Sequence, residues 1–281
     1  MKGQTVIVYN TSIDLADRVF RDMSSWLENR GYEVSSCDSH ECRTGGPAPD
    51  ADFAVSLGGD GTFLSCARLL ADRPIPILPV HLGTFGFITE VTQNEWPDAL
   101  AAWLEGRLEV EDRTILDVRV VRRGRESERF QGVNDAVVSA SGISKLVRLS
   151  LQLGGIEAGH FRGDGLILST ATGSTAYSMA SGGPILVPPM SALVLTPICP
   201  FSLSWRPMVI PEQDEIVIGV EDHQRADVLL TVDGQESAPL GPGDAVRMKG
   251  RPAGVRVIKS DRRVFYEVVR SKLGWSGGPH A

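Results

Sequence analysis

The sequence contains no run of about 18 or more apolar residues, so we expect no membrane-spanning helix and no membrane partner. Its first residues pass directly into a β-like segment, which is not the pattern of a secretory signal peptide. Positive charge is not in excess either, because 35 Asp and Glu outnumber 28 Lys and Arg and leave a net charge of −7. A surface that coats nucleic acid normally carries a basic excess. We therefore expect a cytoplasmic protein without a nucleic-acid partner.

Cysteine is also scarce, with only Cys37, Cys42, Cys66 and Cys199 in the chain. His40 lies between the first two, but no second pair with zinc-ligand spacing follows, which disfavours a zinc site. Reduced, unpaired thiols are the better interpretation for a protein of the cytoplasm. At 281 residues and 42% hydrophobic content, the chain can bury a core without a disulfide or a structural metal.

The pattern of apolar residues changes near residue 107. Before it, continuous apolar runs at 5–9, 53–57 and 75–80 alternate with helical stripes, which predicts strands joined by crossover helices. After it, β-type runs dominate, with Arg122-Arg123-Gly124-Arg125 and Asp233-Gly234 as turn signals. We predict an α/β domain with a parallel sheet over 1–106, an all-β, sandwich-like domain over 107–260, and a tail over 261–281 that packs back on the first domain.

The first motif follows a buried strand and precedes a helix. It contains Gly58, Gly59, Asp60, Gly61 and Thr62. Glycines let the backbone approach a ligand, and a helix N-terminus attracts phosphate. Asp60 suits acceptance of a proton from an attacking hydroxyl or help in holding Mg²⁺. The alternative is a tight turn with Asp60 as N-cap. No P-loop sequence occurs in the chain, which excludes that class of phosphate site.

Two further motifs lie in the β-rich half. Asn134-Asp135 suits paired hydroxyls such as those of ribose, because Asp accepts hydrogen bonds while Asn both donates and accepts them. Taken alone, this pair is more often a plain Asx turn. Residues 162–188 combine hydroxyl side chains, several glycines and one aromatic ring, Tyr177. Such a segment can grip hydroxyls and phosphates while the ring stacks on a base.

Together the three motifs resemble those of the NAD kinase family. The family's Gly-Gly-Asp-Gly-Thr corresponds to residues 58–62, its Asn-Glu/Asp pair to Asn134-Asp135, and its long glycine-rich motif to residues 163–188. Similarity extends over nearly the whole chain, including residues 231–235. The chain departs from the family at Ala171, where proline is usual, and at Thr84, Phe85 and Lys145.

The resemblance implies an enzyme that binds NAD between two domains and phosphorylates it with ATP and Mg²⁺. Asp60 would be the general base that takes the proton of the adenosine 2′-hydroxyl. Family members form homodimers or homotetramers in which subunits contribute to each other's sites. For NAD, the resemblance implies contacts from Asp60, Gly61, Phe87, Asn134, Asp135, Lys145, Arg162, Asp164, Thr172, Thr175, Ala176, Tyr177, Ser178, Met179, Ala180 and Gln235. For phosphate and ATP, it implies Gly58, Gly59, Gly61 and Thr62, with Mg²⁺ carried by ATP rather than by fixed protein ligands.

Two alternatives remain open at this point. A lipid kinase shares the glycine-aspartate loop, but it would need an apolar acceptor pocket, and the hydroxyl-rich segment fits a polar dinucleotide better. A non-catalytic NAD- or NADP-binding sensor would keep the fold, although Asp60 is intact. The residues alone do not decide between ATP and inorganic polyphosphate as donor, or between NAD and NADH as acceptor.

Overall fold

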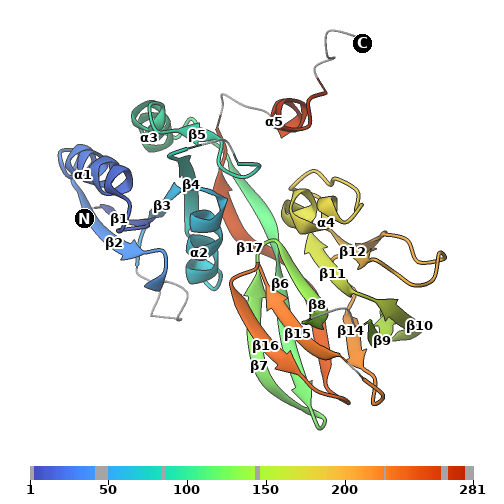
Figure 1. The fold of residues 1–281 in the computed structure, drawn as a ribbon. Coiled ribbons are helices and arrows are strands. Elements are labelled where there is room, and N and C mark those ends of the chain that lie inside the picture. Colours follow the sequence, from blue (N-terminus) through green and yellow to red (C-terminus); the bar gives the residue numbers. More distant parts are fainter. Residues whose placement is uncertain are drawn as a thin grey trace. The chain divides into compact units, whose positions relative to one another are not determined.

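The chain divides into two compact units (Figure 1). The computed structural model describes residues 3–41, 50–83, 86–142, 146–224, 226–260 and 265–275. Unit 1 comprises Met1–Asp112 and Val255–Ala281, and unit 2 comprises Arg113–Gly254. Both boundaries fall inside strands, β6 (Val110–Arg122) and β17 (Ala245–Ile258), rather than in loops near residues 106 and 260. No helix among the described residues is long and apolar enough to cross a membrane.

Unit 1 is an α/β unit with the predicted parallel sheet. Its strand order is β17–β4–β3–β1–β2, and every one of these pairs is parallel. The strands that belong wholly to this unit are β1 (Gly3–Tyr9), β2 (Tyr32–Asp38), β3 (Phe53–Gly58), β4 (Pro76–His81) and the short β5 (Val91–Thr92). The helices are α1 (Asp14–Glu28), α2 (Asp60–Leu70), α3 (Trp96–Leu104) and α5 (Phe265–Lys272).

Burial explains why the strands of unit 1 read as continuous apolar runs. A parallel sheet is covered on both faces, so its central strands need apolar side chains in both directions. All six residues of β4 are buried, and so are the first five of β3. Helix α1 presents a buried stripe of Ala16, Val19, Met23 and Leu27 and packs with α3 in one hydrophobic cluster with these strands.

Unit 2 is a sandwich of two sheets. One sheet has the order β13–β12–β11–β8–β15–β16, antiparallel throughout, and the other joins β10, β9, β14 and β17, with β6 and β7 paired beside β17. The strands not yet bounded are β7 (Arg125–Gly132), β8 (Asp135–Ser141), β9 (Val147–Leu153), β10 (Ile156–Gly163), β11 (Gly165–Thr170), β12 (Ala192–Ile198), β13 (Met208–Pro211), β14 (Ile216–Val220), β15 (Asp227–Val232) and β16 (Glu236–Leu240). A short 3₁₀ helix (Thr172–Thr175) and α4 (Tyr177–Ala180) follow β11.

The core of unit 2 forms where alternate residues of both sheets meet. One strand from each sheet illustrates the pattern: Leu149 and Leu151 of β9 are buried, as are Val228 and Leu230 of β15. Because side chains alternate along a strand, each sheet contributes one face to this core. The predicted all-β, sandwich-like architecture is confirmed, and so are both predicted turns, in which Arg123, Gly124, Asp233 and Gly234 all have positive φ angles.

The cysteines require one correction. Cys37 is disulfide-bonded, which contradicts the prediction that all the thiols are reduced. Cys42 lies outside the described residues. Cys66 and Cys199 are free thiols, and Cys66 is fully buried in α2, where burial raises the pKa of its thiol far above its usual range.

Candidate functional site

The glycine-aspartate loop of unit 1 connects the C-terminal end of β3 to α2. Gly59 is the N-cap of α2 in an extended conformation, and Asp60 is the first residue of the helix. The alternative interpretation of Asp60 as the N-cap is therefore wrong. Gly58 is required by a close approach, because a Cβ atom there would lie 2.3 Å from Oγ1 of Thr62. The loop thus brings Thr62 back over the strand end, where α/β folds bind ligands.

The Asp60 carboxylate reaches across to the segment that precedes β5. Its Oδ2 accepts the backbone N–H of Phe87 at 3.0 Å, and its Oδ1 accepts the hydroxyl of Thr89 at 3.2 Å. Any side chain at Gly86 would collide with it, since a Cβ atom there would lie 1.8 Å from Oδ1. These two donors fix the orientation of the carboxylate and leave it further lone pairs for a substrate hydroxyl.

Two buried polar residues near the glycine-aspartate loop were not predicted from the sequence. Thr89 is buried and binds Asp60 through its side chain. His81 is buried at the end of β4, in register with Gly58, and its Nδ1–H donates to the carbonyl of Gly83 at 3.0 Å. The position of His81 at a strand end was the available signal. Thr84 and Phe85 lie outside the described residues.

In unit 2, the Asn134-Asp135 pair and the glycine-rich segment pack directly against each other. The backbone N–H of Thr170 donates to the carbonyl of Asn134 at 2.9 Å, and its hydroxyl donates to the carbonyl of Val133 at 2.7 Å. Gly173 lies so close that a Cβ atom would be 2.0 Å from the carbonyl oxygen of Asn134. The structure therefore brings together two motifs that lie more than thirty residues apart in the sequence.

Several polar atoms of this cluster are buried and unsatisfied. Within the described residues, Oδ1 of Asn134, Oγ of Ser169 and Oγ1 of Thr172 have no hydrogen-bond partner. Such a group costs about 1–3 kcal/mol, and nearly all buried polar groups in native proteins are paired. Asn134 and Thr172 were both predicted as ligand contacts, and a polar ligand would supply the missing partners.

Asp135 adds a buried carboxyl group to the same cluster. Its side chain is 6% exposed. Burial, together with the negative charge of Asp233, raises the pKa of Asp135 from 3.8 to about 7. The group therefore changes between neutral and charged near neutral pH. In its charged form it is an acceptor suited to the hydroxyl groups of a sugar.

Other hydroxyls of the glycine-rich segment are already satisfied by the protein. The hydroxyl of Ser174 donates to the carbonyl of Ala171 and accepts the N–H of Leu186. Ser178 is fully buried, with its hydroxyl 2.7 Å from that of Thr196, and Thr175 donates to the carbonyl of Thr172 at 3.2 Å. These contacts stabilise the turn that carries Tyr177, whose side chain is exposed at 47%. Ala176 lies in the same turn, and Met179 and Ala180 lie in α4, which begins at Tyr177.

Arg162 and Asp164 lie at the opposite end of β11 from this cluster. The pairing of Gly165 with Ser139 and of Ser169 with Asp135 separates the two ends by the length of the strand, about 17 Å at 3.3 Å per residue. At that end the thiol of Cys199 donates a hydrogen bond to the Asp164 carboxylate, which raises the pKa of the thiol. The Arg162 guanidinium lies 4.9 Å from the ring centroid of Phe201.

Two predicted residues remain to be placed. Gln235 follows the turn after β15, where its N–H donates to the carbonyl of Val232 at 3.0 Å. Lys145 lies outside the described residues. Across the described part of the chain, no three His, Cys, Asp or Glu side chains cluster so as to hold a metal ion by themselves.

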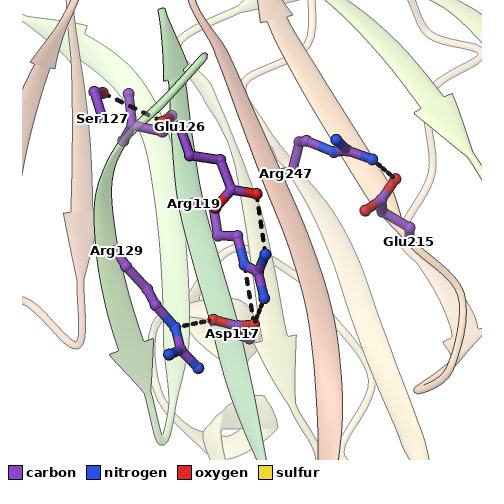
Figure 2. A network of polar contacts seen from close by, with 8 residues as sticks. Asp117, Arg119, Glu126, Ser127, Arg129, Glu215 and Arg247 are labelled. Carbon is purple, nitrogen blue, oxygen red and sulfur yellow. Dashed lines mark hydrogen bonds and ion pairs between the residues drawn. The ribbon is translucent and has the colours of Figure 1, made fainter. Parts of the chain in front are cut away.

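A second polar region lies on β6, β7 and β17 and at Glu215, the residue before β14 (Figure 2). Asp117 accepts hydrogen bonds from Arg119 and Arg129, and although its burial acts in the other direction, these arginines lower its pKa. Arg119 also binds Glu126 at 3.0 Å, and Arg247 binds Glu215 at 2.8 Å. Apart from Arg129, these residues line an open cavity of about 160 Å³ together with Met248 and Lys249. Here acidic and basic groups are paired and partly exposed.

Two protein-family models match the sequence of this chain. A family model described as the ATP-NAD kinase N-terminal domain matches residues 47–108, and the ATP-NAD kinase C-terminal domain matches residues 133–260. Together they cover more than half of the chain. This chain belongs to the NAD kinase family. The resemblance inferred from the three motifs is confirmed, and the lipid-kinase alternative is not favoured.

Curated relatives extend the match over almost the full length. An NAD kinase from Treponema denticola is 41% identical over 278 residues, covering 98% of this chain and 97% of the relative. An NAD kinase from Syntrophotalea carbinolica is 39% identical over 92% of this chain and 93% of its own.

Solved structures of the NAD kinase family share the fold. A yeast NADH kinase complexed with NADH matches with a TM-score of 0.87 at 21% identity, over 98% of this chain and 88% of that one. An NAD kinase from Archaeoglobus fulgidus in complex with ATP matches with a TM-score of 0.76 at 24% identity, over 98% of this chain and all of the other.

Proposed function

We propose that this chain transfers the terminal phosphoryl group of ATP to the adenosine 2′-hydroxyl of NAD, giving NADP and ADP. The observation that carries the proposal is the Asp60 carboxylate, held by Phe87 and Thr89 at a strand end of an NAD kinase fold. A ribose hydroxyl is a poor nucleophile at neutral pH, and a positioned general base contributes about 10²–10⁴-fold to such a reaction.

The reaction follows from this geometry. Asp60 accepts the proton of the 2′-hydroxyl while the hydroxyl oxygen bonds to the terminal phosphorus of ATP. The bond from that phosphorus to the bridging oxygen breaks, and ADP leaves with the electron pair. ATP would enter as its Mg²⁺ complex, and the ion would supply positive charge to offset that of the phosphates. The hard carboxylate oxygens of Asp60 are compatible with such an ion nearby.

The remaining site residues take roles that fit their chemistry. Gly58, Gly59, Gly61 and Thr62 lie at the N-terminus of α2, which favours phosphate. The Asn134 amide, the Asp135 carboxyl and the Thr172 hydroxyl bind polar groups of NAD, and the exposed ring of Tyr177 stacks on one of its rings. Phe87, Lys145, Thr175, Ala176, Ser178, Met179, Ala180 and Gln235 complete the proposed set.

The proposal also includes a homodimer or homotetramer in the cytoplasm. The oligomer is supported by the position of Arg162 and Asp164, which β11 keeps about 17 Å from the Asn134 cluster of the same chain. In an oligomer these two residues can serve the site of a neighbouring copy.

The test is NADP formation from purified protein, NAD, ATP and Mg²⁺. Asp60→Asn is expected to fold and bind NAD but to lose turnover by about 10²–10⁴-fold. Asp14→Asn is the matched control, because Asp14 is likewise the first residue of its helix, α1, and lies outside the proposed site. Near-normal turnover in Asp60→Asn would remove Asp60 from the role of base.

The same assay separates the open alternatives. Binding of NAD without product from either ATP or polyphosphate would favour the sensor. Replacing NAD by NADH, or ATP by polyphosphate, defines the acceptor and the donor.

A further inference from the structure

The turn between β15 and β16 holds the Asn134-Asp135 segment through one side chain. The Asp233 carboxylate accepts three successive backbone N–H groups, from Val133 at 3.0 Å, Asn134 at 2.7 Å and Asp135 at 3.1 Å. Its own backbone N–H donates to the carbonyl of Asp135 at 2.9 Å. Four hydrogen bonds therefore join residues that lie about one hundred positions apart in the sequence.

The backbone conformation suits this arrangement. Asp233 has a φ of 52°, in the left-handed region that Asp tolerates better than most residues. Gly132 permits the close approach, because a Cβ atom there would lie 3.0 Å from a methyl carbon of Val232. A carboxylate that accepts N–H groups forms charge-assisted hydrogen bonds, which are stronger than those between neutral groups.

Resting on the proposed function, we infer that Asp233 is a positioning residue of the NAD site. Its carboxylate fixes the backbone of residues 133–135 and so directs the side chains of Asn134 and Asp135 toward the dinucleotide. Asp233 does not touch the substrate in this scheme. It acts through the segment that it holds.

Asp233 has a second effect on the same segment, an electrostatic one. Asp135 is paired with Ser169 of β11, which is uncharged, and is faced by Asp233 from the β15–β16 turn. Burial and the charge of Asp233 together raise the pKa of Asp135 to about 7. Removing that charge lowers the pKa of Asp135, whereas a change in turn stability alone does not.

The decisive variant is Asp233→Asn. Asparagine keeps the volume and the tolerance of a positive φ, but it removes the charge and turns an NH₂ group toward backbone N–H donors. Asp244→Asn is the matched control, because Asp244 also accepts a backbone N–H within a turn of unit 2, from Gly241 at 2.9 Å. Asp233→Gly, which tolerates the φ without strain, serves as a second variant if the first does not fold.

Three measurements are made on the full chain. Hydrogen–deuterium exchange reports the amides of residues 133–135. Steady-state kinetics gives kcat with KM for NAD and for ATP, and calorimetric binding of NAD is measured between pH 5 and 9. For Asp233→Asn we expect faster exchange at these amides and a KM for NAD raised tenfold or more at an unchanged KM for ATP. The pH midpoint of NAD binding should move to lower pH, and Asp244→Asn should match wild type in all three.

The outcomes separate the inference from the proposed function. Unchanged exchange, or an unchanged KM for NAD with an unmoved pH midpoint, overturns the positioning role even if the enzyme makes NADP. Equal losses in both variants reduce Asp233 to a turn former, which also overturns it. If wild type neither binds NAD nor forms NADP, the proposed function fails, and amide exchange still shows whether Asp233 holds the segment.

Discussion

Unit 2 contains two polar regions that differ in how their groups are satisfied. On β6 and β7, Asp117, Arg119 and Glu126 form paired contacts at the surface (Figure 2). Around Asn134 and Thr172, polar atoms are buried and lack partners in the described part of the protein. The first region is complete without a ligand, and the second is not.

This difference has an energetic meaning. Exposed ion pairs contribute about 0–1 kcal/mol each, so the network can vary with little consequence. A buried unpaired polar group costs about 1–3 kcal/mol, and a fold retains it where a bound ligand recovers that cost. Single unsatisfied hydroxyls also occur in the described part of unit 1, at Ser24 and Ser56. What supports the proposed site is therefore the grouping of such atoms from Asn134, Ser169 and Thr172 beside Asp135, rather than the density of charge.

The largest effect is expected from filling the contact between the two motifs. Gly173→Ala places a Cβ atom 2.0 Å from the Asn134 carbonyl oxygen, a backbone atom that cannot move without breaking the Thr170 bond. We expect a loss of about 3 kcal/mol or more in urea unfolding and the loss of NAD binding. The control is Gly241→Ala, whose Cβ atom would meet only an Asp244 oxygen at 3.7 Å. Equal stability of the two variants would contradict the packing described.

The next largest effect concerns pH. An acid with a raised folded pKa gives stability that is fully present below its unfolded pKa and is lost as pH rises through its folded pKa. The rise of the Asp135 pKa from 3.8 to about 7 corresponds to roughly 4 kcal/mol, of which we expect about half after the site relaxes.

Asp135→Asn removes this titration. Without ligand, wild type should therefore lose about 2 kcal/mol relative to the variant between pH 4 and 8. Urea unfolding at several pH values measures the difference. If the stability difference between wild type and variant stays constant with pH, Asp135 is not buried as described. The variant should also bind NAD poorly at every pH.

A smaller effect separates an unsatisfied hydroxyl from a satisfied one. Thr172→Val removes a buried oxygen without a partner, so stability should hold or rise while the Kd for NAD increases about tenfold. Ser174→Ala removes a hydroxyl that binds Ala171 and Leu186, so stability should fall by about 1–2 kcal/mol. Thermal unfolding and NAD titration of both variants measure these effects. If Thr172→Val lost more stability than Ser174→Ala, the assignment of satisfied and unsatisfied hydroxyls would be wrong.

The smallest effect belongs to the surface network. Arg247→Gln breaks the ion pair between Arg247 and Glu215. The side chains of these two residues are 47% and 41% exposed, respectively. Stability should change within about 0.5 kcal/mol, and the rate of NADP formation should not change. A marked loss of activity would show that this region is more than a set of surface ion pairs.

Local patterns were sufficient to predict most of the fold. Continuous apolar runs identified β3 and β4, because both faces of a parallel sheet are buried, and alternating runs identified the sandwich. The strand–loop–helix context correctly placed Asp60 at the start of the helix that follows β3. The unit boundaries inside β6 and β17 were not predicted, because no turn residue marks a point within a strand.

The site was predicted less completely, for a physical reason. The partners of Asp60 lie 27 and 29 residues away, and those of Asp233 about one hundred, so no local spacing connects them. Sequence also cannot distinguish Thr172 from Ser178, since the direction of each hydroxyl depends on packing. The disulfide of Cys37 was missed for the same reason.

The order in which the ribosome delivers the chain bears on how unit 1 forms. Its sheet includes the end of β17, where Arg256 pairs with Pro76 and Val257 with Ile77. All of unit 2 is synthesised between these partners, which takes roughly 10–30 s at about 5–20 residues per second. During that time β5 already pairs with β4 at Val80 and His81, but the first residues of β4, Pro76 and Ile77, lack their neighbour on that side. An open strand edge invites pairing with other chains. We therefore expect the protein to depend most on chaperones, and to be most prone to aggregate, while its N-terminal part is made but β17 is not.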